Sequence, residues 1–204
     1  MPDNNLKQCK PKKDQRLILF VVLVTTLLDA MSIGLIIPVT PDLIMSVAPK
    51  LNFGDAATLS GLLISLFAFM QLFFGPFFGT LSDQIGRRRI FLFLLVTIIV
   101  YHFIFALGQS LWLLFLGRLI GGVGAATNPI SAAILADVFT PKDRAVKFGY
   151  LGAAFGLGFV VGPVVGGFLG ELGIRAPFLG RSIFSRYKFC LGMALPSRNP
   201  FSQE

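Results

Sequence analysis

The sequence predicts an all-α, polytopic helical membrane protein, and two observations lead to that fold class. Hydrophobic residues make up 54% of the 204-residue chain and charged residues only 14%, whereas charged residues are about a quarter of a typical soluble domain. Several apolar runs are also long enough to cross a bilayer as helices, since about 20 residues at ~1.5 Å each span ~30 Å of hydrocarbon. The first run is too long for a signal-peptide core, so we expect it to stay as the first span.

The apolar runs define five membrane-spanning helices and a weaker sixth segment. Between them lie a loop at 40–56, the turn "GTLSDQIGRRR", a tight "GQS" turn and the loop "FTPKDRAVK". We therefore expect a basic tail at 1–16, a helix bundle at 17–178, and an aberrant sixth span with a C-terminal tail at 179–204. The expected spans are 17–39, 57–78, 90–108, 111–136, 146–170 and, as the weaker one, 176–195.

Positive charges gather on one side of the expected helices. In short loops, eleven Lys and Arg residues fall on the side of the N-terminal tail and two on the other side. Cytoplasmic loops carry such an excess, so we expect the chain in the inner (plasma) membrane with its N-terminus in the cytoplasm. The net charge of +8 then indicates membrane topology rather than nucleic-acid binding. The eleven are Lys7, Lys10, Lys12, Lys13, Arg16, Arg87, Arg88, Arg89, Lys142, Arg144 and Lys147, and the two are Lys50 and Arg175.

The sixth segment carries three cations, Arg181, Arg186 and Lys188, in an otherwise apolar stretch. Each cation at mid-membrane costs ~2.5–3.5 kcal/mol unless it reaches the interface or finds a partner. We therefore expect this span to be marginal and, because the chain stops soon after it, a truncated or frame-disrupted product. Cys9 and Cys190 are far apart and fit neither a disulfide framework nor a metal site.

Two opposite charges fall inside the expected spans at a similar depth. Asp29 lies about 18 Å and Arg118 about 19 Å from the inner surface, counted along the first and fourth spans. An unpaired charge there is expensive, so we expect an ion pair or a water-filled cavity. The pair could simply hold two helices together, or Asp29 could take and release a proton during transport. Gln71 and Asn128 also lie within spans and could line the same cavity or join two helices.

The fifth span contains a glycine stripe. Gly158, Gly162 and Gly166 recur every four residues and share one helix face, which lets a neighbouring backbone approach closely. Pro163 removes a backbone hydrogen bond and favours a bend. The stripe is typical of ordinary tight helix packing, and the proline within it also fits a bend that seals the outer half of a moving bundle.

The turn between the second and third spans combines glycine, an acid and a cation cluster. Gly79 and Gly86 permit tight turns at the end of one helix and the start of the next. Asp83 could cap a helix or pair with a cation, and Arg87 and Arg88 could hold partner groups on the cytoplasmic surface. The simpler interpretation is a loop that only fixes topology.

Together these motifs resemble the major facilitator superfamily, and within it the drug/proton antiporters of the tetracycline-efflux type. "GTLSDQIGRRR" is similar to the family's loop between helices 2 and 3, and "RLIGGVGAA" to its helix-4 motif. "GLGFVVGPVVGG" resembles the helix-5 antiporter motif, and "LLDAMSIGLIIPVTPDLI" the first-helix signature of tetracycline pumps. "ADVFTPKDRAVKFG" resembles the loop after helix 4, so the resemblance covers about residues 17–178.

The resemblance implies twelve helices in two six-helix halves, of which this chain is the N-terminal half, with substrate bound between the halves. It implies a transporter rather than an enzyme, which exports drugs or amphiphilic small molecules and uses no cofactor besides the proton gradient. The implied partners are the bilayer, the small-molecule substrate and a missing C-terminal half or a second copy. The family's motifs correspond to a proton and substrate cavity at Asp29, Arg118, Gln71 and Asn128, a cytoplasmic gate at Gly79, Asp83, Gly86, Arg87 and Arg88, and an antiporter bend at Gly158, Gly162, Pro163, Gly166 and Gly167.

The chain departs from the family pattern at Tyr101, where many tetracycline pumps carry an acid, and at Gln84 and Arg89 in the turn. The cargo therefore stays open, and a carrier of another small metabolite is an alternative. A non-functional truncated remnant is a second alternative, favoured by the cations of the sixth segment. An intramembrane hydrolase built on Ser110 and His102 is disfavoured, because the two residues do not share a helix face and Ser110 lies in an outer turn.

Overall fold

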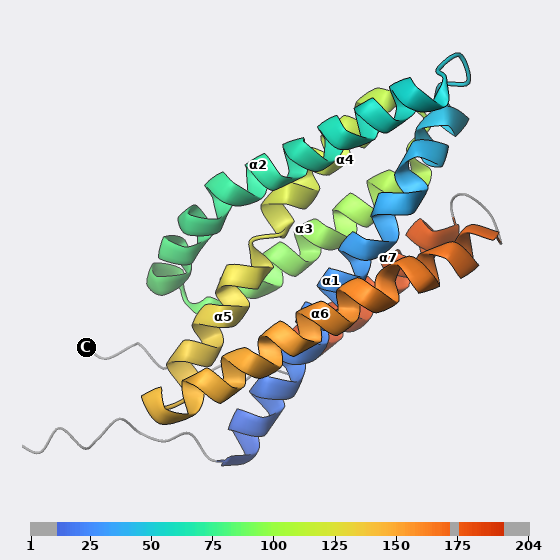
Figure 1. The fold of residues 1–204 in the computed structure, drawn as a ribbon. Coiled ribbons are helices and arrows are strands. Elements are labelled where there is room, and N and C mark those ends of the chain that lie inside the picture. The colour runs from blue at the N-terminus through green and yellow to red at the C-terminus, as the bar shows by residue number, and fades with distance from the viewer. Residues whose placement is uncertain (1–11, 172–175, 194–204) are drawn as a thin grey trace, which may run out of the picture.

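The structure, a computed structural model, describes residues 12–171 and 176–193, and all of the regular elements in these ranges are helices (Figure 1). The all-α fold class is thereby confirmed. The helices are α1 (Lys12–Val47), α2 (Phe53–Ile85), α3 (Arg87–Leu107), α4 (Leu111–Gly124), α5 (Thr127–Val138), α6 (Pro141–Glu171) and α7 (Ala176–Met193).

Within the described residues, five spans are long and apolar enough to cross a membrane, as the sequence predicts. They correspond to α1, α2, α3, α6 and the combined stretch Leu111–Val138, which contains both α4 and α5. The fourth span is thus broken in the middle, whereas the sequence predicts one continuous helix there. The cause of the break is local and is described with the site below.

The helices extend beyond the hydrophobic runs that predict them. Most of the expected loop at 40–56 is helical, because α1 continues to Val47 and α2 already begins at Phe53. Asn52 caps α2 by accepting a hydrogen bond from the Asp55 backbone N–H at 2.8 Å. Hydropathy marks the part of a helix inside hydrocarbon, and polar ends add turns on either side that it does not detect.

The bundle is organised around α1. Helix α6 packs along α1, α7 packs mainly on α3, and α4 packs on both α2 and α3 (Figure 1). One buried apolar cluster includes Val22, Phe91 and Ile134, and a second includes Leu43 and Phe105. These two clusters hold opposite ends of the bundle together and leave a level between them where polar side chains are buried.

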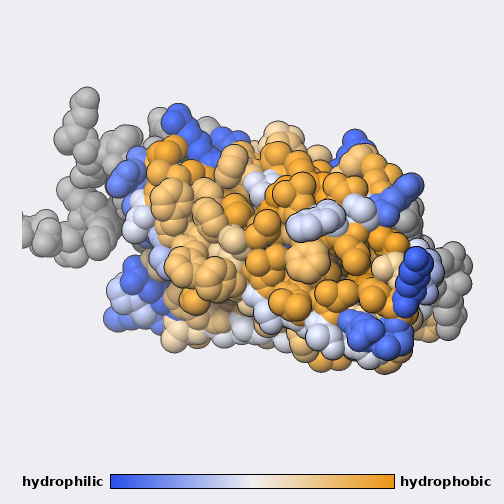
Figure 2. Space-filling model, turned by 90° about the horizontal axis from the view of Figure 1, so that it is seen from above, coloured by the Kyte–Doolittle hydropathy of each residue, from blue (hydrophilic) through white to orange (hydrophobic). Residues whose placement is uncertain are grey.

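The outer faces of α2 and α6 are strongly apolar. Figure 2 shows a broad hydrophobic band with hydrophilic side chains at both of its ends. On α2, Leu72 is 70% exposed, and on α6, Phe168 is 71% exposed. Such a band requires lipid or a partner of similar polarity, because a monomer in water rarely exposes so much contiguous apolar surface.

The sixth segment forms a helix despite its cations. Most of α7 lies outside the residues over which membrane spans can be assigned, because the side chains of residues 176–184 are outside the described part of the structure, so the marginal character of this span stays a prediction. Lys188 is nevertheless fully buried, while Arg186 is exposed. The side chains of residues 170–184, Arg181 among them, lie outside the described part of the structure, as do residues 1–11 of the basic tail and residues 194–204.

Candidate functional site

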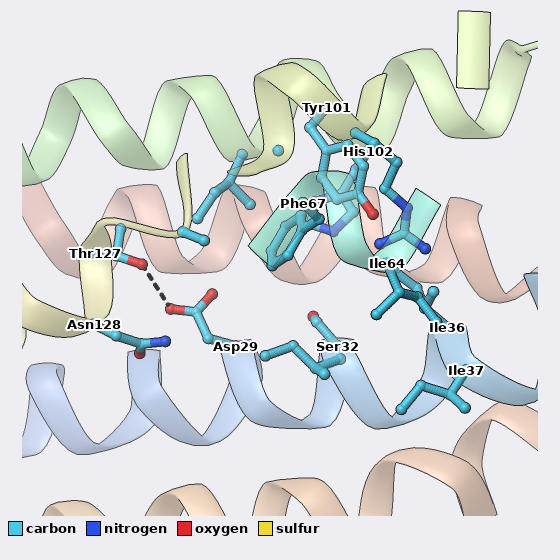
Figure 3. A pocket seen from close by; sticks show the side chains of 15 residues that line it. Asp29, Ser32, Ile36, Ile37, Ile64, Phe67, Tyr101, His102, Thr127 and Asn128 are labelled. Carbon is cyan, nitrogen blue, oxygen red and sulfur yellow. Dashed lines mark hydrogen bonds between the residues drawn. The ribbon is translucent and has the colours of Figure 1, made fainter. Parts of the chain in front are cut away.

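Asp29 is the carboxylate at the centre of the bundle. It projects from α1 and is 8% exposed. Its Oδ2 accepts a hydrogen bond from the Thr127 hydroxyl at 3.2 Å, as Figure 3 shows, and Thr127 is the first residue of α5. Its Oδ1 lies 2.5 Å from the Lys188 ammonium of α7 in a salt bridge. Asp29 therefore joins three helices that are far apart in the sequence.

Arg118 does not pair with Asp29. Among the described residues, no ion pair joins the two; of the two arrangements expected, a pair or a cavity, the structure has a cavity lined by both side chains. The guanidinium of Arg118 instead lies over the rings of Phe67 and Phe105, at 5.8 Å and 5.1 Å from their centres. Equal depth does not bring the two side chains together, because depth does not fix the direction in which each side chain points from its helix.

A cavity of about 80 Å³ separates the two charges. It has space for a few water molecules or a small polar group. Arg118 is 3% exposed, and its Nε and Nη2 find no hydrogen-bond partner among the described residues. The lining is mainly apolar and aromatic: Asp29, Ser32, Ile33, Ile36, Ile37, Ile64, Phe67, Ile98, Tyr101, His102, Arg118, Gly121, Ala125, Thr127 and Asn128.

Figure 3 shows how the labelled side chains face each other across this cavity. Asp29, Ser32 and Asn128 lie on one side, with Phe67 and Tyr101 opposite. Tyr101 thus contributes an aromatic ring to the wall. The cavity combines one carboxylate, one guanidinium and apolar surface, a mixture suited to an amphiphilic molecule with a polar group.

Gln71 is not among the residues that line the cavity. Its amide Nε2 donates to the backbone carbonyl of Ala125 at 3.4 Å. This bond corresponds to the helix-to-helix alternative weighed for Gln71, whereas Asn128 lies on the cavity wall. The described residues also contain no group of three His, Cys, Asp or Glu side chains that could hold a metal ion.

The break between α4 and α5 positions Thr127. Over Ala125 and Ala126 the helix tightens, and Ala126 N–H bonds to Val123 O at 3.2 Å, three residues back. The preceding glycines allow close packing: a Cβ on Gly121 would lie 2.8 Å from the Tyr101 ring, and one on Gly122 would lie 2.7 Å from Phe67 O. The sequence analysis missed the break, although "GGVGAAT" offered the glycine signal for it.

The glycine stripe of α6 lies against α1 next to Asp29. A Cβ on Gly158 would meet Leu27 O, and a Cβ on Gly162 would lie 2.5 Å from Met31 O. The approach is reciprocal, since a Cβ on Gly34 of α1 would lie 2.8 Å from the Pro163 ring. Gly166 also packs on α1, against Leu35, whereas a Cβ on Gly167 would meet only open space. Helix α6 continues through Pro163 as one element, and the bend assigned to these residues stays a prediction.

The cationic turn is centred on Arg87. Its Nη2 lies 2.6 Å from Asp83 Oδ1 in α2, and its Nε lies 2.6 Å from Asp137 Oδ2 in α5. Gly86 adopts a φ of 108°, which only glycine tolerates well, and so joins α2 directly to α3. Asp137 was missed, because it stands in another loop motif and only the fold brings it to Arg87.

The structure also shows the surroundings of Gly79, Arg88, Ser110 and His102. Gly79 lies inside α2 rather than at a turn, because α2 continues through the polar residues to Ile85. Arg88 donates to the backbone carbonyl of Met193 at 2.8 Å, which ties the turn to α7. Ser110 caps α4, and the His102 ring contacts the Ser185 hydroxyl of α7 at 2.7 Å, so the serine and histidine of the disfavoured hydrolase have separate structural roles.

Comparison with known proteins identifies the family. The sequence model of the Major Facilitator Superfamily matches residues 22–185. Tetracycline resistance protein, class B, of Escherichia coli is 40% identical over 173 residues, which are 85% of this chain and 42% of that protein. Multidrug resistance protein 1 of Bacillus subtilis (strain 168) is 35% identical, over 94% of this chain and 49% of its own length. The chain therefore spans less than half the length of these relatives.

Solved structures share the fold. The crystal structure of the human organic anion transporter MFSD10 superimposes with a TM-score of 0.78 at 26% identity, over 92% of this chain and 48% of that one. The peptide transporter POT superimposes with a TM-score of 0.77 at 18% identity, over 90% of this chain and 38% of that one. The fold described above is thus that of about half of such a transporter chain.

Proposed function

The chain belongs to the Major Facilitator Superfamily, and we propose that it forms the N-terminal half of a proton-coupled antiporter that exports drugs or similar amphiphilic small molecules. The observation that carries this proposal is the Asp29 carboxylate in an apolar cavity at the middle of a membrane bundle. Ionisable groups at such depth are rare and mark proton or substrate pathways. The relatives named for tetracycline and multidrug resistance support the same class of cargo.

The cavity chemistry fits this role. Asp29 is the group that takes and releases the proton, and Arg118, on the opposite wall, is the cation available to a polar group of the substrate. Phe67 and Tyr101 supply flat apolar surface for the rest of an amphiphile. Because the resemblance leads to the expectation of an acid at the position of Tyr101, the identity of the cargo stays open.

A second half completes the proposed transporter. Of the five spans, those of α2 and α6 are the least buried. Only 11% and 22% of the residues in their most apolar stretches are buried inside the bundle. Their outer faces are suited to an apolar partner helix bundle, either a C-terminal half or a second copy of the chain. Transporters of this kind bind substrate between two such repeats, which one half cannot enclose by itself.

The proposed location is the inner (plasma) membrane, with the cationic turn facing the cytoplasm. Arg87, Arg88 and Arg89 lie at the same end of the bundle as the start of α6, where Lys142 and Arg144 add charge (Figure 1). Loops rich in Lys and Arg stay on the cytoplasmic side. The pairing of Arg87 with Asp83 and Asp137 would then form one side of a cytoplasmic gate.

A resistance assay tests the proposal. The chain is expressed in a drug-sensitive host that lacks its own pumps, alone and fused to the C-terminal half of a related tetracycline pump. We expect resistance from the fusion, loss of resistance with Asp29→Asn, and retention with Asp55→Asn, an exposed carboxylate at the start of α2. Membrane abundance of each variant is measured, since Asp29→Asn also removes the salt bridge to Lys188.

The outcomes separate the alternatives. Resistance from the chain alone would identify a second copy as the partner, and resistance from the fusion alone would identify a C-terminal half. Intact export by Asp29→Asn would contradict the role of this carboxylate. No resistance from any version, despite insertion, would favour a non-functional remnant or a carrier of another small metabolite.

A further inference from the structure

Lys188 is the most deeply buried cation described in the bundle. The residue has no exposed surface, and its ammonium lies 2.5 Å from Asp29 Oδ1. Because Thr127 already donates to Oδ2, both oxygens of the carboxylate are occupied by groups from other helices. The carboxylate that the proposed function needs is therefore held from both sides.

The register of α7 places this ammonium. Ser185, Lys188 and Gly192 follow at intervals of three and four, so they share one helix face. Ser185 contacts His102, and a Cβ on Gly192 would lie 2.8 Å from Leu95 Cδ1, so this face packs closely on α3. Arg186 lies on another face and is exposed. Lys188 is thus directed into the bundle by packing on both sides of it.

A tethered cation competes strongly for the carboxylate. A free ligand loses translational freedom when it binds, whereas Lys188 is already delivered by its helix at a high effective concentration. A proton or an external cation that uses Asp29 Oδ1 must displace this ammonium.

We propose that Lys188 is an internal ligand of Asp29, through which α7 keeps this carboxylate occupied until α7 shifts or the ammonium is removed. This inference rests on the proposed function of Asp29 and adds to it a residue that controls access to the carboxylate. It also assigns α7 a role at the carboxylate rather than only at the edge of the bundle.

Carboxyl labelling tests the inference directly. The full-length chain in membrane vesicles is treated with an apolar carbodiimide, and mass spectrometry measures the adduct on Asp29. Carbodiimides react with a carboxyl group that carries a proton and is open to the reagent, and a carboxylate bound to an ammonium is neither. We expect Lys188→Met to label at least about tenfold faster than the unaltered chain, because an ion pair at this depth resists replacement. The matched variant Arg186→Met, with an exposed cation two residues away, should label like the unaltered chain.

Equal labelling of the unaltered chain and Lys188→Met, at equal membrane abundance, would overturn the inference. If Lys188→Met does not accumulate in the membrane, the exchanged pair Asp29→Lys/Lys188→Asp decides. The double variant should recover the abundance that each single variant loses, and a double variant no better than the singles would overturn the pairing.

The labelling needs no transport, so the two proposals fail separately. If Lys188→Met labels faster but the unaltered chain fused to a related C-terminal half exports no drug, the internal ligand is supported and drug efflux is not. Export without any labelling difference would leave the efflux proposal standing and overturn the internal ligand.

Discussion

Arg87 joins three helices through one side chain. Its guanidinium contacts Asp83 and Ser82 at the end of α2 and Asp137 at the end of α5, while its backbone starts α3. A planar guanidinium can bind several acceptors at once, which a lysine ammonium at the same place does with less geometric control. The contacts of Arg87 with Ser82, Asp83 and Asp137, called the Arg87 joint below, therefore hold α2, α3 and α5 together whether or not they also form a gate.

Replacing Arg87 should weaken this joint. We expect Arg87→Gln to lower the free energy of unfolding by about 1.5–3 kcal/mol, since it removes charged hydrogen bonds on a side chain that is 20% exposed. Arg89→Gln, on an exposed side chain two residues on, should change it by less than about 0.5 kcal/mol. Denaturant titration in detergent micelles measures both, and equal effects would show that the joint contributes nothing beyond net charge.

Thr127 offers a second test at the residue scale. Thr127→Val keeps the side-chain shape but removes the hydroxyl that donates to Asp29, so we expect a loss of about 1–3 kcal/mol from the unmatched acceptor. Thr25→Val is the matched control, because its equally buried hydroxyl bonds only to Val21 O of its own helix. The same titration compares them, and an equal loss for both would contradict a special role of the Thr127 bond.

The sequence singles out the candidate site residues better than their partners. Asp29 and Arg118 stand out as charges in apolar runs, and their depth follows from counting residues. Which way each side chain points around its helix is not fixed by depth, so the Lys188 and Thr127 contacts of Asp29 could not be predicted. Asp137 was missed for the same reason, since its partner lies 50 residues away.

At the scale of whole elements, the close contact between α1 and α6 depends on glycine residues, which have no side chain to keep the two helices apart. The glycine face of α6 meets backbone atoms of α1 between Leu27 and Leu35, on both sides of Asp29. Without glycine, the two helices would have to separate, and the carboxylate would shift relative to α5 and α7. The stripe therefore sets the geometry of the cavity as well as the packing.

One substitution pair tests this contact. We expect Gly158→Ala to destabilise the bundle by about 1–3 kcal/mol or more, because the added Cβ would collide with the backbone at Leu27 O. Gly167→Ala lies on the same helix with open space around it and should be neutral or stabilise by up to about 1 kcal/mol. Unfolding free energies in micelles measure the difference, and similar losses at both positions would refute a face-specific contact.

The existence of the spans could be predicted, but not their ends or their continuity. Long apolar runs identify membrane helices because bilayer thickness imposes a minimum length. Hydropathy does not detect polar helical turns beyond the hydrocarbon, and α1 and α2 therefore extend past the ends that it predicts. Hydropathy also does not detect the break at Ala125 and Ala126, because the residues there are as apolar or small as those of the helices on either side.

At the scale of the whole molecule, polar groups are buried between two apolar clusters. Asp29 lies between these clusters along α1, as Arg118 does along the fourth span. A bundle built this way can hold charges away from both water and lipid only if its helices keep their register. The distribution of positive charge between the two ends of the bundle also acts on the molecule as a whole, because it sets the direction in which the bundle inserts into the membrane.

The orientation of the bundle can be tested with one cysteine on each side. Arg89, in the first turn of α3, and Lys50, in the turn before α2, are both exposed and lie beyond opposite ends of α2 (Figure 1). In a background with Cys9→Ser and Cys190→Ser, a membrane-impermeant maleimide should label Lys50→Cys in intact cells. It should label Arg89→Cys only after permeabilisation, because the excess of cations keeps that end in the cytoplasm. The reverse pattern would overturn the orientation and place the Arg87 joint on the outer side, where it could not serve a cytoplasmic gate.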